Sequence, residues 1–227
     1  MRRANGEVQD SDAVQHRGAV GTALGSLQES QKAGPLSTPV LAGKFAELSP
    51  LTPAHAEVTL RWRQSDRARL LNRGASTVEE QQAWIETRER EGDQNFMISY
   101  RGQPVGMIAL HDISHRHRHA VMGRFLIGEA EAVSGTAVAY ESELLVCDYA
   151  YDALKMHKLH GDVLATNEAM LRWRKYLGWS KDGVLRDHYV FDGQYATAIM
   201  FSLMEEEYRR RCRPRLLGLV SAASASR

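Results

Sequence analysis

The sequence predicts an α/β protein in which helices cover both faces of a mixed sheet. Strand-like and helical runs alternate in the order strand, two helices, three strands, helix, strand, helix and two strands. Residues 125–137 place an apolar run, a small-residue turn and the start of a long helical run in succession. No proline occurs between Val105 and Arg213, which indicates one uninterrupted domain over this part of the chain.

The composition is typical of a globular protein of ordinary size. The 227 residues carry a net charge of +1, and 43% of them are hydrophobic, so we expect neither a nucleic acid nor a membrane as partner. Two cysteines, Cys147 and Cys212, offer no disulfide framework and no metal-binding spacing. We expect no signal peptide, because no apolar run follows Arg2 and Arg3. A cytoplasmic protein, monomeric or homodimeric, is therefore expected.

Three segments differ in composition. Residues 1–42 are rich in Gly, Ala, Ser and Gln without a sustained period, which predicts a disordered extension. Residues 43–208 carry the periodic apolar patterns and form the predicted domain. Residues 209–227 are basic and then Ala/Ser-rich, which predicts a flexible tail.

The first half of the predicted domain contains four strands and two helices. Pro50 ends the first strand, and Thr77 with Glu80 three residues later favours a capped start for the second helix. Period-2 alternation predicts the next strand, and continuous apolar runs predict the two after it. In order, we expect these elements over residues 45–48, 54–69, 77–90, 96–100, 105–110 and 120–127.

The second half begins with a long helix whose apolar residues recur at spacings of 3 and 4. Asn167 is placed to cap a second helix that ends at Gly178. Asp192-Gly193 predicts a hairpin turn between the last two strands. We expect these elements over residues 136–157, 161–165, 167–178, 183–191 and 195–204.

The small-residue turn at residues 132–137 carries the clearest functional signal. A helix that starts after a strand presents unpaired N–H groups and the positive end of its dipole to an anion. Gly135 lets the backbone approach a ligand closely. The alternative is an ordinary capped helix start. We expect the anion on the N–H groups of Ser134, Gly135, Thr136, Ala137 and Val138.

This turn resembles the pyrophosphate signature of the GNAT superfamily of acyl-CoA N-acetyltransferases, Gln/Arg-x-x-Gly-x-Gly/Ala. Gly135 and Ala137 match it, whereas Ala132 replaces the leading Gln or Arg. Asn167 followed by an amphipathic helix and Leu177-Gly178-Trp179 is similar to a second family pattern. The resemblance covers about residues 44–208 and implies the GNAT fold, a mixed, largely antiparallel sheet of six to seven strands with helices on both faces.

Further matches resemble one branch, the nucleotide-sugar N-acetyltransferases of the pseudaminic-acid type and, more loosely, the ribosomal-protein N-terminal acetyltransferases. The resemblance implies acetyl-CoA as co-substrate, no metal, and the amino group of a sugar, possibly nucleotide-linked, as acceptor. A protein or peptide N-terminus is an alternative acceptor, and a non-catalytic acyl-CoA-binding module is an alternative function. The matching residues are Trp62-Arg63, Glu79-Glu80, Trp84, residues 185–188, Gly193, Tyr195 and Met200-Phe201.

The resemblance also implies roles around the cofactor. Strand N–H groups near Leu126, Ile127 and Gly128 would polarise the thioester carbonyl, with the pyrophosphate on the turn after them. Asn167 would bind the pantetheine arm, cap its own helix, or do both. No cysteine nucleophile is required, because the amine attacks the thioester directly.

The implied catalytic and acceptor residues are less regular. Arg174 occupies the place where the family often has the tyrosine that protonates the CoA thiolate, and Tyr176 lies about 200° further around the helix. Either would act on the thiolate, with Glu129 as base for the amine. The alternatives are a solvated arginine, a packed tyrosine and an exposed loop acid. The expected acceptor residues are Trp62, Arg63, His111 and His188. Trp62 is alternatively core, His188 alternatively acts as base, and either histidine is alternatively an ordinary surface residue.

Three histidines alternate at His115, His117 and His119, which invites a metal site. Arg116 and Arg118 lie between them, and acidic or cysteine partners at suitable spacing are missing nearby. A solvated basic turn is therefore the preferred interpretation.

Overall fold

The computed structural model describes residues 37–71, 74–191 and 193–225. The predicted extension lies mostly outside these ranges, and so does Asp192 of the predicted hairpin turn. The described part of the extension already contains a strand, β1 (Leu41–Ala42). The ordered domain therefore begins before residue 43, where the sequence pattern placed its start.

Within the described residues, eight strands form one sheet in the order β1-β2-β3-β4-β5-β6-β8-β7. Every neighbouring pair is antiparallel except β5 and β6, which run parallel. This confirms the mixed, largely antiparallel sheet, with one strand more than the six to seven expected. The other strands are β2 (Glu47–Pro50), β3 (Gln94–Tyr100), β4 (Gln103–Ser114), β5 (His119–Ile127), β6 (Lys158–Leu164), β7 (Ser180–Phe191) and β8 (Gln194–Met204).

The helices begin and end where local signals place them. Thr77 accepts the N–H of Glu80 at the start of α2, and Asn167 accepts the N–H of Met170 at the start of α4. Gly178 ends α4 in the left-handed region. The helices are α1 (Ala56–Gln64), α2 (Val78–Arg90), α3 (Val138–Asp148), α4 (Glu168–Leu177), α5 (Glu205–Glu207) and α6 (Arg213–Ala225).

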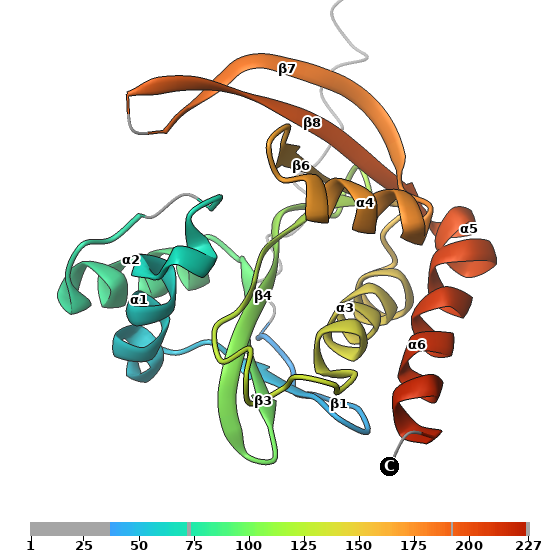
Figure 1. Cartoon of the computed structure of the whole chain (residues 1–227), viewed down its shortest axis with the longest axis horizontal. Coiled ribbons are helices and arrows are strands. Elements are labelled where there is room, and N and C mark those ends of the chain that lie inside the picture. Colours follow the sequence, from blue (N-terminus) through green and yellow to red (C-terminus); the bar gives the residue numbers. More distant parts are fainter. Residues whose placement is uncertain (1–36, 72–73, 192, 226–227) are drawn as a thin grey trace, which may run out of the picture. The chain divides into compact units, whose positions relative to one another are not determined.

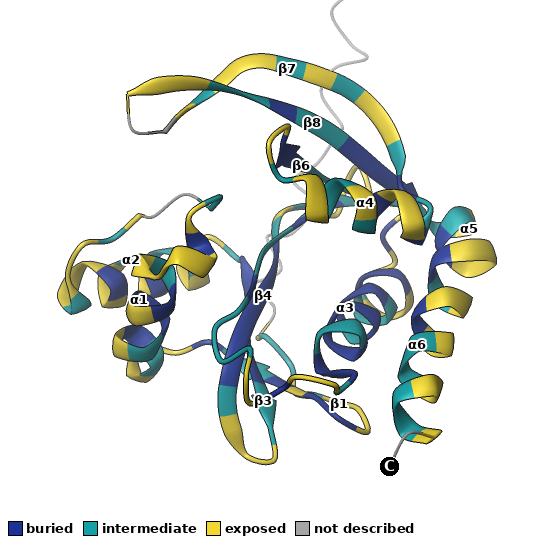
Figure 2. Cartoon of the chain, viewed as in Figure 1, coloured by how far each residue is buried: buried dark blue, intermediate teal, exposed yellow. Residues whose placement is uncertain are grey.

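Alternate residues of the central strands pack on opposite faces of the sheet. In β3, Phe96 and Ile98 pack with α3, α4 and α6, whereas Met97 packs with α1 and α2. β4 repeats the pattern with Ile108 and Met107. Figure 1 shows α1 and α2 on one side of β4 and α3 and α6 on the other. Figure 2 shows that burial is densest in the central strands and in α3.

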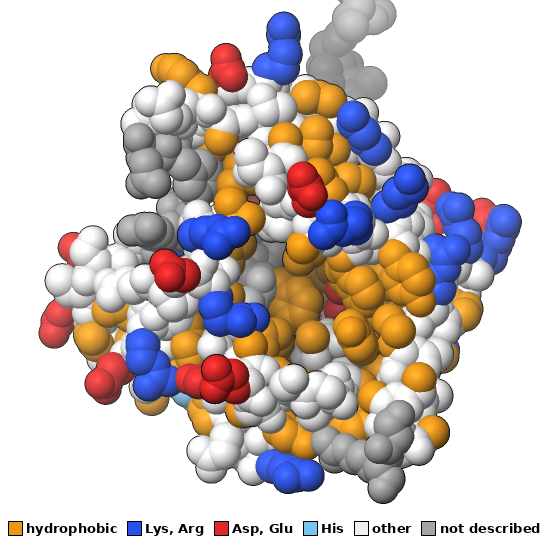
Figure 3. All heavy atoms as spheres, viewed as in Figure 1, with side chains coloured by type: hydrophobic (Ala, Val, Ile, Leu, Met, Phe, Trp, Pro, Cys, Tyr) orange, Lys and Arg blue, Asp and Glu red, His pale blue; other side chains and the backbone are white. Residues whose placement is uncertain are grey.

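The predicted long helix over residues 136–157 is shorter in the structure. Regular α-helix stops at Asp148, and a π-helical turn continues over Tyr149–Ala153. α3 is buried on more sides than its apolar stripe predicts, because α6 covers its outer side. In the view of Figure 1, the surface of the molecule has a hollow, with apolar side chains inside it and Lys or Arg side chains on its rim (Figure 3).

The predicted flexible tail is wrong for the residues up to Ala225. After α5, a π-helical turn (Tyr208–Cys212) leads into α6. Tyr208, Cys212 and Leu216 are fully buried, and their spacing of four places them on one helix side. The basic and Ala/Ser-rich composition concealed this stripe.

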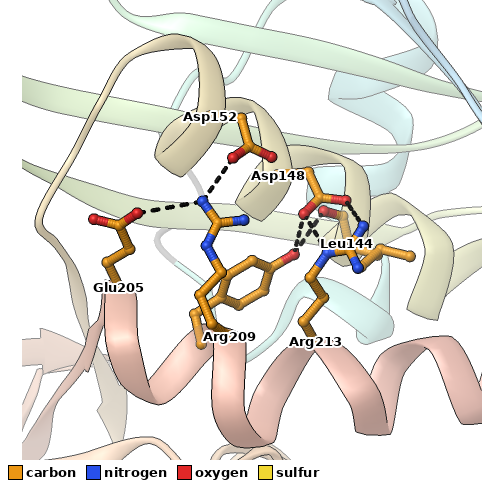
Figure 4. A network of polar contacts seen from close by, with 7 residues as sticks. Leu144, Asp148, Asp152, Glu205, Arg209 and Arg213 are labelled. Carbon is orange, nitrogen blue, oxygen red and sulfur yellow. Dashed lines mark hydrogen bonds and ion pairs between the residues drawn. The ribbon is translucent and has the colours of Figure 1, made fainter.

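Polar contacts also tie this segment to α3 (Figure 4). Asp148 accepts the Tyr208 hydroxyl at 2.8 Å and Arg213 Nε at 2.8 Å. Arg209 bridges Asp152 and Glu205. No helix in the part of the chain that the structure describes is long and apolar enough to cross a membrane.

Candidate active site

A gap opens within the sheet between β5 and β6. The two strands pair only from His119 to Val121, opposite Lys158 to His160. Beyond Val121, β5 stays paired with β4, while β6 stays paired with β8 as far as Leu164. The gap therefore exposes one edge of β5 in the middle of the sheet.

Two features of β5 favour this separation. The pairing of β4 with β5 shifts register between Met107 and Ala109, opposite Gly123. Arg124 then adopts the left-handed region, with φ +54°. Such a bulge bends its strand and increases its local twist.

The backbone groups at the end of β5 do not all face the gap. Gly128 donates its N–H to Val105 O at 2.9 Å, and Leu126 pairs with Met107, so both residues face β4. Ile127 lies between them and faces the opposite way, into the gap. Its carbonyl accepts Arg67 Nε at 3.0 Å. Of the three expected thioester donors, the structure therefore leaves Ile127, and the role predicted for the Leu126 and Gly128 N–H groups is wrong.

The turn before α3 (residues 132–137) retains part of the expected anion-binding cradle, the set of backbone N–H groups predicted over residues 134–138. Ser134 and Thr136 donate their N–H groups to carbonyls within the turn, and Val138 donates to the Thr136 hydroxyl. The N–H groups of Gly135 and Ala137 make no hydrogen bond with any residue that the structure describes. Gly135 has φ +70°, which favours glycine. Of the five N–H groups predicted to bind the anion, the structure therefore leaves those of Gly135 and Ala137 for it.

Arg174 does not reach toward the gap as a free cation. Its Nη1 lies 3.0 Å from Glu143 Oε1, and the two side chains are only 8% and 1% exposed. The guanidinium also lies 3.9 Å from the centroid of the Trp179 ring. Trp173 Nε1 completes the contacts of Glu143 at 2.7 Å. Arg174 is thus a structural link between α3 and α4, and both its predicted catalytic role and the solvated alternative are wrong.

Tyr176 is 47% exposed. Its ring stacks on Trp173, which in turn stacks on Tyr140. Arg215 of α6 also lies near this ring, with its carbon Cζ 5.6 Å from the ring centroid. No contact in the described structure links this ring to the gap, so its role as proton donor stays a prediction.

Glu129 joins the end of β5 to α1. Its Oε1 accepts Trp62 Nε1 at 2.7 Å and Arg61 Nη2 at 2.5 Å. Trp62 itself is 3% exposed, and a Cβ at Gly128 would lie only 2.2 Å from its ring. Trp62 is therefore a core residue held against the strand end, rather than a residue lining an acceptor pocket, and the arginine already compensates the Glu129 charge.

A cationic and aromatic cluster lies on the face of α1 and α2. The Cζ atom of Arg63 lies 5.7 Å from the centroid of the Trp84 ring, and the Cζ atom of Arg124 lies 5.1 Å from it. Arg124 also pairs with Asp93 at 2.7 Å and contacts Asn95. Burial and the nearby Arg124 lower the pKa of Arg63. The sequence singled out Arg63 here, but neither Arg124 nor Asp93, because their partners are distant in the chain.

The two expected acceptor histidines are in different settings. His111 Nδ1 lies 2.8 Å from Asp112 Oδ2, and burial lowers the His111 pKa. His188 is exposed on β7, where its ring contacts Tyr189. No contact in the described ranges brings His188 to the other predicted site residues.

The alternating histidines lie at the β4–β5 connection. His115 and His117 are exposed in the turn, and His119 begins β5. His119 Nδ1 lies 3.3 Å from His160 Nε2. No group of three metal-ligating side chains occurs among the residues that the structure describes.

Comparison with known proteins agrees with this architecture. The model of the acetyltransferase (GNAT) domain family matches residues 46–180, which is more than half of the chain. The chain belongs to this family. The matched range ends at the first residue of β7, so β8 and the C-terminal helix that covers α3 lie outside the matched residues.

Two curated relatives align with the GNAT protein over about half of its length. Spermidine N(1)-acetyltransferase of Escherichia coli K12 is 28% identical over 118 residues, which are 52% of this chain and 62% of that protein. YdaF of Bacillus subtilis, provisionally named a ribosomal N-acetyltransferase, is 26% identical over 111 residues, or 49% and 59%. The chain therefore spans less than two thirds of either relative.

A solved structure shows the same fold over a longer range. Mycobacterium smegmatis RimJ in complex with CoA-disulfide superposes with a TM-score of 0.66, covering 79% of this chain and 90% of that chain at 20% identity. These relatives agree with the GNAT assignment and with a ribosomal acetyltransferase among its neighbours. The pseudaminic-acid branch stays a prediction.

Proposed function

We propose that this GNAT protein is an acetyl-CoA-dependent N-acetyltransferase. The observation that carries the proposal is the gap between β5 and β6, which opens beside the turn at the N-terminus of α3. An extended ligand arm with amide groups can pair with the exposed edge of a strand, as an added strand does. The pantetheine arm of CoA has this chemistry, and a neighbour with the same fold holds CoA-disulfide.

Different residues around the gap would bind different parts of acetyl-CoA. The N–H groups of Gly135 and Ala137, with the dipole of α3, would hold the pyrophosphate. Asn167 stands at the start of α4 and would contact the pantetheine arm while capping its helix. The loss of the usual basic or amide side chain at Ala132 shifts phosphate binding onto the backbone.

Transfer would proceed by direct attack of a neutral amine on the thioester. Holding both reactants together would supply much of the acceleration, and the Ile127 N–H would polarise the thioester carbonyl. Neither cysteine suits a covalent route. Cys147 and Cys212 are fully buried, and burial raises the pKa of both thiols.

The acceptor we propose is an amino group on a sugar, possibly nucleotide-linked. Aromatic and guanidinium groups at Trp84, Arg63 and Arg124 suit a ring with phosphate or hydroxyl substituents. A peptide N-terminus is the second candidate, because one relative is named for a ribosomal acceptor. Arg63 and Arg124 place guanidinium groups on this face, although Asp93 compensates the charge of Arg124. Guanidinium groups favour a phosphate over a polycation, so spermidine should be a poorer acceptor than a phosphate-bearing sugar despite the spermidine-acetylating relative.

A panel of amines separates these possibilities. CoA release is measured with glucosamine 6-phosphate, a nucleotide-linked amino sugar, a tripeptide and spermidine. Turnover of either sugar supports the proposed acceptor, and turnover of the tripeptide alone supports the second candidate. Acetyl-CoA binding without transfer to any of them would indicate a non-catalytic module.

The cofactor site is tested by Gly135→Glu. A carboxylate in the cradle should repel the CoA phosphates and weaken acetyl-CoA binding by at least about tenfold, measured by calorimetry. Gly102→Glu is the matched control, because Gly102 also has a positive φ and open space around its Cβ position, in the β3–β4 turn. Equal affinities of the two variants would contradict the proposed site.

A further inference from the structure

We propose that His111 is the general base of the acetyl transfer, held by Asp112 and directed over Gly123 at the start of the gap. The assignment rests on the proposed function. It replaces Glu129, whose Oε1 is already bound by Trp62 and Arg61.

The first support is the orientation of the imidazole. Nδ1 lies 2.8 Å from Asp112 Oδ2, so the carboxylate favours the tautomer that carries its proton on Nδ1. Nε2 then keeps the lone pair that a base needs. A Cβ at Gly123 would lie 3.0 Å from Nε2. A glycine at this position therefore gives the ring room to lie against β5.

The second support is the place of Gly123 in the sheet. Pairing between β5 and β6 ends at Val121 and His160, two residues before Gly123. Because side chains alternate along β4, His111 lies on the same face as Met107, the face of α1 and α2. Nε2 therefore meets an amine that approaches from α1 and α2 while the thioester lies in the gap.

The third support is the backbone at Asp112. This residue has φ +49°, within a register shift of β4 between His111 and Ser114. Consecutive side chains on a regular strand point to opposite faces, so Asp112 reaches its neighbour only because the bulge turns it back. A left-handed non-glycine residue costs roughly 1–2 kcal/mol, and such strain is concentrated at functional sites.

The surrounding charges favour a neutral imidazole. Burial and the Arg124 guanidinium on β5 lower the His111 pKa, while Asp112 and the more distant Asp93 act in the opposite direction. His160 on β6 also interacts electrostatically with His111, and the His160 pKa is lowered mainly by burial. His111 is therefore mostly unprotonated near neutral pH.

The proposed step balances without another reactant. The amine nitrogen forms a bond to the thioester carbon, and Nε2 takes one proton from that nitrogen. The C–S bond breaks with its electron pair on sulfur, and the imidazolium returns the proton to the thiolate. An amine and acetyl-CoA thus give an N-acetylamine and CoA.

The test compares His111→Ala with wild type across about pH 5 to 9, on the amine panel above. His111→Ala should lower kcat about 100-fold or more, with the KM for acetyl-CoA unchanged, and added imidazole should restore part of the rate. His115→Ala is the matched control, because His115 is exposed in the neighbouring turn, and it should leave kcat unchanged.

Asp112→Asn tests the positioning role. Asparagine tolerates the left-handed backbone, so the bulge should survive. Loss of the carboxylate removes a group that raises the His111 pKa. The acid limb of the kcat profile, where His111 becomes protonated and inactive, should therefore move to lower pH, with a smaller loss of kcat than in His111→Ala.

Each outcome decides the assignment. Wild-type kcat in His111→Ala, with an unchanged pH profile, overturns the base and leaves the proposed function standing. Acetyl-CoA binding by wild type without transfer to any amine overturns both. Nitrogen NMR of the wild-type imidazoles, assigned with His111→Gln, is independent of turnover. A His111 proton on Nδ1 supports the assignment, and a proton on Nε2 overturns it.

Discussion

Two charged pairs on opposite faces of the sheet differ in how far they are buried. On the face of α3, α4 and α6, the Glu143–Arg174 pair is 1% and 8% exposed and fully committed to protein contacts. On the face of α1 and α2, the His111 and Asp112 side chains are 19% and 78% exposed. A buried pair resists any change of charge, because either partner alone would be costly to bury. A partly exposed histidine can exchange a proton with a substrate.

The backbone of the two strands that border the candidate site follows this division. Asp112 in β4 and Arg124 in β5 both adopt the left-handed region next to register shifts. On the face of α1 and α2, the Asp112 side chain then contacts His111, and the Arg124 side chain contacts Asp93. Two of the six non-glycine residues with positive φ in the described part of the chain therefore lie beside the proposed chemistry, in β4 and β5.

The largest change in stability is expected from Arg174→Met. Leaving Glu143 buried without its cation should lower the free energy of unfolding by about 3–5 kcal/mol, measured by urea denaturation. The kcat of the folded fraction should change only a few-fold, since Arg174 is structural. Arg172→Met is the control, because that surface pair with Glu168 is exposed and should contribute less than about 1 kcal/mol. A large loss of kcat with unchanged stability would restore the catalytic role that the sequence suggested.

A similar or smaller effect is expected from Leu216→Ala in α6. Leu216 is fully buried against the α3 face, so the cavity should cost about 2–5 kcal/mol of unfolding free energy. Leu217→Ala, at the exposed neighbouring position, should stay within about 0.5 kcal/mol of wild type. Equal melting temperatures for the two variants would show that α6 does not stabilise the sheet face that α3 covers.

The smallest effect is expected from Cys147→Ala. The thiol is buried, and burial raises its pKa, so it does not form the thiolate that a covalent route needs. Stability should fall by about 1 kcal/mol through lost packing, and kcat should remain near that of wild type. Complete loss of acetyl transfer in the folded variant would argue for an acyl-cysteine intermediate instead.

The sequence alone predicted the elements whose signals are local. Thr77, Asn167 and Gly178 each act within four residues of their own position, so a short stretch of chain determines the helix ends. The alternation of β3 and the small-residue turn before α3 are equally local. From these the mixed sheet, the two covered faces and the GNAT family were predictable.

Only the tertiary structure decided what the polar residues do. Glu129 meets Trp62 across 67 positions, and Arg174 meets Glu143 across 31, so no local pattern shows that their charges are already satisfied. The stripe from Tyr208 to Leu216 acquired meaning only when α3 offered a surface to cover. His111 gained its candidate role from a glycine on another strand. Burial and charge pairing depend on which distant residues meet, and folding alone brings them together.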